Sequence, residues 1–189
     1  MDSLQMIEKL KLAGISFDSG MSGTELDRAE TVFQFRFPKE IRDFLSLGVP
    51  VGGSFFNYRD LSEKNIKRFQ EFQANIESSF RFDLENNRED MMEMFGEKLG
   101  FLQYPDSFDN AVIRYLIESP RLIPFYAHRC FFDGLDDMPI ISFWQAVDTI
   151  FYGGNFENYL EHEFLNKERV LENIPDRMKH TGIWYDIIW

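Results

Sequence analysis

The chain contains a single cysteine, Cys130, so no disulfide bond can form within it. Such scarcity is typical of proteins from a reducing compartment. Long apolar runs are also missing, because no stretch approaches the roughly 18 uninterrupted apolar residues that a transmembrane helix needs. The opening residues, MDSLQMIEKLKLAG, carry charged side chains and do not resemble a secretory signal. We therefore expect a cytoplasmic protein without a membrane partner.

Basic residues are scarce as well. The chain has 20 Lys and Arg against 32 Asp and Glu, a formal net charge of −12 at pH 7. Direct binding to nucleic acid or to an anionic membrane needs a concentration of basic side chains, so both partners are disfavoured. Two interpretations of the acidity remain. One is solubility, and the other is a surface that attracts a basic protein partner.

Phenylalanine is abundant, with 21 residues in a chain of 189. This length suits one domain that buries a sizeable core, and the rings predict that the core is rich in aromatic side chains. We expect a single domain over residues 1–189. Within it, residues 1–23 form an N-terminal helix and loop, and residues 165–189 form a C-terminal extension that docks on the core.

Apolar residues at helical spacing predict a short helix over the first dozen residues, followed by a loop over 14–23. Thr24 is expected to cap the next helix. In the helix after it, Pro38 takes the first position and Gly48 the left-handed C-terminal position. Further helices are expected over 62–80, 91–95, 108–118 and 156–164, with a polar break over 81–90 and a turn at 104–106.

Strand signals concentrate in residues 120–164. Pro124 lies inside an apolar run at 122–126 and cannot donate a ladder hydrogen bond, which predicts an edge strand or a bulge. Residues 131–139, FFDGLDDMP, predict a hairpin loop around an Asp-Gly pair. Asn155 is expected to cap the helix that follows. Other strands are expected at 140–144, 147–152 and, briefly, 55–58.

The apolar C-terminal residues TGIWYDIIW are expected to dock on the core as a strand or turn, because a solvated end would not carry Trp184 and Trp189 together. Helices and strands do not alternate as they do in βαβ units. The order therefore favours an α+β fold.

Few residues suggest catalysis. His128 and Cys130 are two residues apart and could share one face of a strand, as a nucleophile pair or part of a zinc site. No further ligand or orienting residue has suitable spacing, so we favour a structural polar His128-Arg129 pair with a packed Cys130. The Gly52-Gly53 pair lacks the remainder of a phosphate loop. No metal, cofactor or catalytic residue is therefore expected.

Two features could serve either packing or recognition. Asp148 lies between apolar neighbours in an expected strand and is either a satisfied buried carboxylate or a surface contact; we favour the former. Phe55 and Phe56, with Tyr58 and the C-terminal tryptophans, could form a recognition surface. For Phe55 and Phe56 we favour the core.

Three segments form an ordered set of motifs. One is residues 24–45, with Glu30 and the pattern FPKEIRDFL. Another is PVGGSFFNYRD at 50–60, and the strongest is RLIPFYAHR at 121–129 followed by PIISFWQAVDTIFYGGNFENYLEHEF at 139–164. Together they resemble the SUKH superfamily, which includes fungal cell-wall-assembly regulators, the Syd protein and bacterial immunity proteins. The segment at 50–60 is similar to that family's Pro-x-Gly, Asn-Trp-Arg-Asp region, with Tyr58 in place of Trp. Ala127 and Cys130 depart from the expected Gly and Tyr, and GIWYD is a weaker copy of a late family motif.

The resemblance implies an α+β fold with a small antiparallel sheet flanked by helices, and no enzymatic activity. It also implies an immunity or antitoxin protein that neutralises a polymorphic toxin, such as a basic nuclease, by occlusion. The alternatives are a regulatory or scaffold module that binds cellular proteins without a toxin, and a hydrolase that uses Cys130 and His128. The candidate partner-binding residues are Asn57, Tyr58, Arg59, His128, Arg129 and Asp148.

Overall fold

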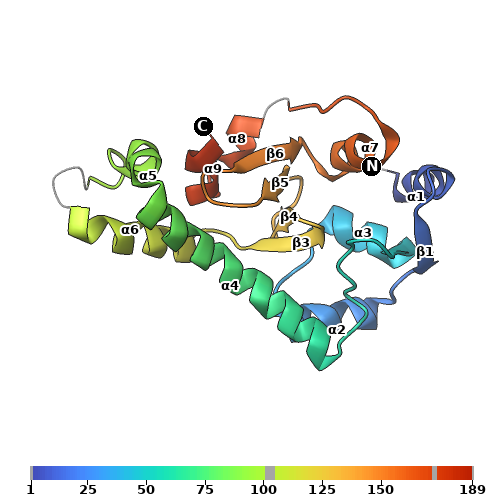
Figure 1. Ribbon diagram of the computed structural model, residues 1–189. Helices are drawn as coiled ribbons and strands as arrows, with labels where there is room; N and C mark the ends of the chain where they lie inside the picture. The colour runs from blue at the N-terminus through green and yellow to red at the C-terminus, as the bar shows by residue number, and fades with distance from the viewer. Residues whose placement is uncertain (1, 101–104, 172–173, 189) are drawn as a thin grey trace.

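The computed structural model describes residues 2–100, 105–171 and 174–188 (Figure 1). It confirms the α+β class, with two small antiparallel sheets flanked by helices. One sheet pairs β1 (Ser16–Ser19) with β2 (Gly48–Val51). The other is a meander in the order β3-β4-β5-β6, formed by Leu122–Tyr126, Arg129–Phe132, Ile140–Phe143 and Thr149–Gly153.

The N-terminal helices are α1 (Ser3–Leu12), α2 (Gly23–Phe33) and α3 (Lys39–Leu47). Ser22, and not Thr24, caps α2: its hydroxyl accepts from the Glu25 N–H while the Glu25 carboxylate accepts from the Ser22 N–H. This reciprocal capping box satisfies two backbone donors at once, which explains why the helix begins two residues early.

The prediction of a loop over residues 14–23 was wrong in part, because β1 lies inside it. Gly48 was also misassigned: its φ of −171° is extended backbone, and it begins β2 directly after α3. These two strands are paired across about thirty residues of sequence (Ser19 opposite Gly48). Such non-local pairing leaves little trace in either segment taken alone.

The helix expected over 62–80 runs further, as α4 (Glu63–Asn86), with Ser62 as its cap. The polar break expected over 81–90 was wrong, because α5 (Arg88–Phe95) follows after a single residue. Leu84 and Asp83 are buried there, so tertiary contacts stabilise a helix that the polar composition of this stretch does not predict. Of the expected turn at 104–106, Tyr104 lies outside the described residues and Pro105 begins α6 (Pro105–Glu118).

The four-stranded sheet bears out the expectation for Pro124. The strand that holds it, β3, is an edge strand whose register shifts between Pro124 and Tyr126. Ala127, with φ of +50°, turns the chain sharply into β4. The expected hairpin loop at 131–139 is therefore shorter, because Phe131 and Phe132 belong to β4. The short strand expected at 55–58 is reduced to one bridge between Phe55 and Tyr126.

Beyond the sheet the chain continues as helices. Asn155 caps α7 (Phe156–Leu165) as expected, since its side chain accepts from the Asn158 N–H. Two short helices follow, α8 (Ile174–Met178) and α9 (Ile183–Ile188). The C-terminal residues do dock on the core, but as a helix and not as a strand or turn. Trp184 is buried, and its Nε1 donates to the Pro120 carbonyl at 2.6 Å.

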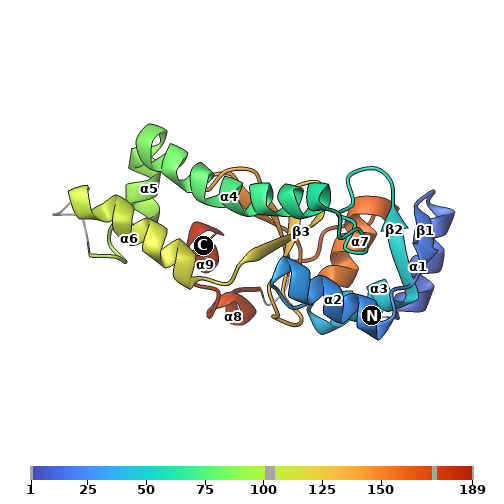
Figure 2. The ribbon, with the colours of Figure 1, turned by 90° about the horizontal axis from the view of Figure 1, so that it is seen from below.

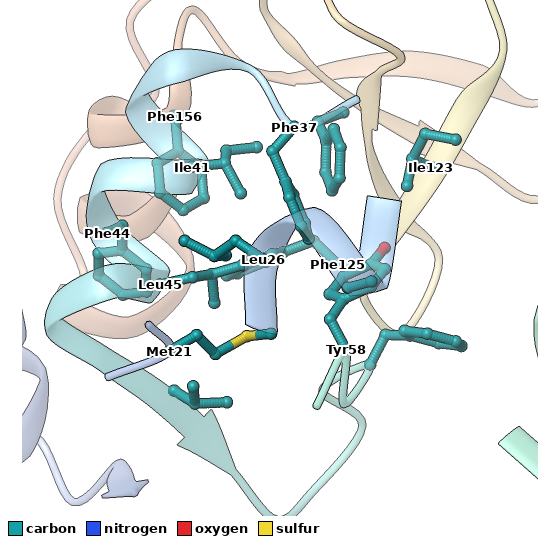
Figure 3. Close-up of a cluster of buried hydrophobic side chains, with 14 of the residues drawn as sticks. Met21, Leu26, Phe37, Ile41, Phe44, Leu45, Tyr58, Ile123, Phe125 and Phe156 are labelled. Atoms are coloured by element: carbon teal, nitrogen blue, oxygen red, sulfur yellow. The ribbon is translucent and has the colours of Figure 1, made fainter. Parts of the chain in front are cut away.

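Two apolar clusters lie on opposite faces of the four-stranded sheet. Ile123, Phe125 and Phe131 face the cluster that includes α1, α2 and α3, while Cys130 and Phe132 face the cluster that includes α6 and α9. Figure 3 shows the first, in which side chains from α2, α3 and β3 interdigitate around Phe37 and Phe44. Both clusters are rich in phenylalanine, as the composition predicted.

The longest helix, α4, runs along the molecule from the side of α2 to α5 and α6, as Figures 1 and 2 both show. It packs against β3 and α6 on the way. None of the helices in the described part of the chain has both the length and the apolar character that crossing a bilayer requires.

Candidate functional site

Tyr58 does not lie on the surface where a partner could reach it. Its ring is 1% exposed, packs against Phe33, Phe37 and Phe56, and donates its hydroxyl to the Pro124 carbonyl. The Tyr-for-Trp position of the resemblance is thus a core position. Its ring connects the loop after β2 to the edge strand β3.

The two neighbours of Tyr58 also serve the loop. Asn57 is exposed, but its side chain accepts from the Arg59 N–H at 3.0 Å and shapes the turn. The Arg59 guanidinium donates to Glu25 and to the carbonyls of Ser19 and Gly20 at 2.8–3.1 Å. Arg59 therefore joins this loop to the beginning of α2.

Arg129 is committed to contacts inside the protein. Its side chain is 11% exposed, its guanidinium carbon lies 3.6 Å from the centre of the Tyr152 ring, and its Nε lies 3.3 Å from Glu163 Oε2. Its Nη1 also donates to His128 Nε2. Cation–π contact and ion pairing together hold β4 to β6 and α7.

His128 accepts that hydrogen bond only as the neutral imidazole. Burial and then the positive charge of Arg129 lower the pKa of His128 below its ordinary value, which agrees with the neutral form. Its ring meets Trp144 edge-on, with ring centres 5.7 Å apart. Asp148 is exposed and close enough to act electrostatically on His128, so the interpretation of Asp148 as a buried carboxylate was wrong.

Cys130 is not placed to act as a nucleophile. It is fully buried between the sheet and the second apolar cluster, and burial raises the pKa of its thiol strongly. The reactive species of cysteine is the thiolate, which such a site disfavours. Among the described residues, no three His, Cys, Asp or Glu side chains are grouped to hold a metal ion.

An open groove that the sequence did not predict lies at this end of the sheet. One wall is a face of α4, and the other is made by the β3–β4 turn and the end of β5. We call it the Trp144 groove, with a volume of about 520 Å³, lined by Phe72, Asn75, Ile76, Ser78, Ser79, Phe82, Ala127, His128, Phe143, Trp144 and Gln145.

Two large apolar side chains of the Trp144 groove are open to solvent. Trp144 is 68% exposed and Phe82 is 49% exposed. Phe82 was missed because it belongs to the expected polar break. The signal that could have found it is the helical spacing that connects Phe72, Asn75, Ser79 and Phe82 along a single face of α4.

Side chains of α4 hold the groove in shape. Gln73 Nε2 donates to the Leu122 carbonyl of β3 at 2.8 Å. Ten residues further along, the buried Asp83 carboxylate accepts from the Val147 N–H at 3.1 Å and from Asn87 Nδ2 at 2.6 Å. Val147 is three residues from Trp144, so Asp83 connects the helix wall directly to the loop that carries the tryptophan.

Of the six candidate residues, the structure brings only His128 and Asp148 to the Trp144 groove and its margin. Arg129 is occupied by contacts with His128, Tyr152 and Glu163. Tyr58 is in the core, and Asn57 and Arg59 stabilise the loop after β2. Comparison of the chain with models of protein families, with curated proteins and with solved structures finds no match in any of the three.

Proposed function

We propose that this chain is a non-enzymatic cytoplasmic protein that binds a basic protein partner through the Trp144 groove. In its most specific form, the proposal is that of an immunity protein, which neutralises a toxin by covering its active site. The observation that carries the proposal is the exposure of Trp144 and Phe82 across a groove with fixed walls.

The exposed rings of Trp144 and Phe82 line one groove and are not scattered singly over the surface. Trp144 and Phe82 remain in water although the chain buries most of its other aromatic rings. Tryptophan is enriched among the few residues that dominate the binding energy of protein interfaces. Fixed walls add to this, because a preorganised surface spends less conformational entropy on binding.

The net charge of −12 supports a basic partner. An acidic surface accelerates the encounter with a basic protein and disfavours acidic competitors. The burial of the Cys130 thiol and the neutral, hydrogen-bonded state of His128 support a role in binding and not in hydrolysis.

Co-expression with the product of the neighbouring gene tests the proposal. We expect the intact chain to rescue growth of cells that make that product and to co-purify with it. Trp144→Ala should weaken both effects, whereas Leu12→Ala, which removes an even more exposed apolar residue from α1, should not. Rescue that survives the loss of both Trp144 and Phe82 would exclude the groove.

A regulatory module without a toxin is the alternative that the resemblance to the fungal regulators supports. It predicts that the full chain captures a cellular assembly and that no growth defect depends on its removal. The same Trp144→Ala variant then reports whether that assembly uses the groove.

A further inference from the structure

We infer that the part of the partner that enters the Trp144 groove is a basic amphipathic helix. Its apolar side chains would contact Trp144 and Phe82, and its Lys and Arg side chains would face Glu71, Glu85 and Asp148. This inference rests on the proposed binding function and specifies the chemistry of the occupant.

The length of the groove suits a short helix. Its α4 wall extends from Phe72 to Phe82, a rise of about 15 Å at 1.5 Å per residue, which matches roughly three turns of a second helix. Between these two rings lie the smaller side chains of Asn75, Ser78 and Ser79. A helix could therefore approach α4 closely between them, with the two rings at its ends.

The backbone around the groove favours a helix over an added strand. Where β3 turns into β4, the Ala127 N–H donates to the Ser54 carbonyl, and the His128 carbonyl accepts from the Phe143 N–H. These groups are already used within the protein, and the other wall is a helix whose backbone is paired internally. Side chains and not a strand edge thus form the contact surface, as in helix-in-groove recognition.

Exposed carboxylates lie beside the groove. Glu71 and Glu85 continue the face of α4 that carries Asn75, Ser78 and Phe82, one turn before and one turn after them, and all are exposed. Asp148 is exposed and acts electrostatically on His128, which belongs to the opposite wall. Of the cations on α4, Lys67 contacts Glu71 at 3.6 Å, and Arg81, next to Phe82, pairs with Glu77 at 2.6 Å. Exposed pairs of this kind contribute little.

Synthetic peptides that differ in the spacing of their apolar residues or in the sign of their charge test the inference. The probes are synthetic peptides of about 18 residues made of Leu and Lys. In one, Leu recurs at helical spacing, and in its isomer Leu alternates with Lys. A third has helical spacing with Glu in place of Lys. Each is titrated into the full chain while the indole N–H resonances of Trp144 and Trp184 are followed by NMR.

We expect the helical Leu–Lys peptide to shift the Trp144 resonance and to leave that of the buried Trp184 in place. Trp144→Ala, whose binding is followed by calorimetry because the Trp144 resonance is then absent, should weaken binding about tenfold or more, as the loss of a central anchor does. Replacement of Glu71 and Glu85 by Gln, or ionic strength of about 1 M, should also weaken it. Asp18→Asn, which neutralises an exposed carboxylate on β1, is the matched control and should not.

Equal binding of the alternating isomer or of the Leu–Glu peptide would overturn the inference. An unchanged Trp144 resonance at peptide concentrations of about 1 mM would also overturn it, because a Kd weaker than about 1 mM does not indicate a specific site. Failure of the helix inference can be distinguished from failure of the proposed binding function. If Trp144→Ala abolishes toxin neutralisation while no helical peptide binds, the groove is a binding site for a different shape of partner.

Discussion

Replacing the buried Asp83 should both destabilise the fold and loosen the Trp144 groove. Its carboxylate is 0% exposed and accepts two hydrogen bonds, from the Val147 N–H and from Asn87 Nδ2. In Asp83→Ala both are lost, and the Val147 N–H loses its acceptor beside the loop that carries Trp144. In Asp83→Asn the amide oxygen can still accept from Val147, and Asn87 can turn its own amide to match.

The expected cost follows from these two bonds. A hydrogen bond to a charged group contributes about 1.5–3 kcal/mol, so two bonds set an upper limit of about 6 kcal/mol. Removing the carboxylate also relieves the cost of burying its charge, which leaves about 3 kcal/mol for Asp83→Ala. For a chain of this size, that loss corresponds to a fall in Tm of about 6–12 °C. For Asp83→Asn we expect about 1 kcal/mol.

Urea unfolding followed by circular dichroism measures these costs, provided the slope m stays constant between variants. Asp18→Ala, an exposed carboxylate on β1, is the control and should remain within about 0.5 kcal/mol of the parent. Binding of the helical Leu–Lys peptide should fall in Asp83→Ala and recover in Asp83→Asn. Equal stability of all the variants, or equal damage by Ala and Asn, would refute the account of Asp83 as the connection between α4 and the Trp144 loop.

Three further predictions concern residues around the site. Tyr58→Phe should cost about 1–3 kcal/mol in urea unfolding, because the Pro124 carbonyl loses its donor, and should leave partner binding intact; lost binding with unchanged stability would return Tyr58 to the interface. The Cys130 thiol should resist alkylation in the folded chain and react at an ordinary rate in urea, whereas rapid labelling of the native protein would contradict its burial. Because the folded pKa of His128 is lowered, the unfolded chain takes up its proton first, so stability should fall as the pH drops below about 6.5. A His128→Gln variant should lose that part of the pH dependence, and an identical pH profile in the two proteins would contradict the lowered pKa.

Local signals predicted much of the fold. The cap at Asn155, the edge position of Pro124 and the aromatic core each depend on properties of one residue type, which hold in most surroundings. The predictions failed where contacts with residues distant in the sequence determine the local structure. Gly48 looked like a helix end and instead begins β2, because its extended backbone can pair with β1.

The candidate site was predicted least well. Asn57, Tyr58 and Arg59 carry chemistry that suits recognition, yet the fold uses Tyr58 in its core and Arg59 to fasten a loop. The Trp144 groove was missed because its walls come from two segments about sixty residues apart. One of those walls, at Phe82, belongs to a stretch whose polar composition suggested no helix.

The sequence by itself determined an acidic, aromatic-rich α+β chain and located most of its helices and two of the residues that shape its sheet region, Pro124 and Asn155. These depend on composition, periodicity and backbone preference, which act over a few residues. Only the tertiary structure decided which aromatic rings are buried and which remain in water. That choice depends on how α4 packs across the end of the sheet, and through it Trp144 and Phe82 come to face solvent while Tyr58 does not.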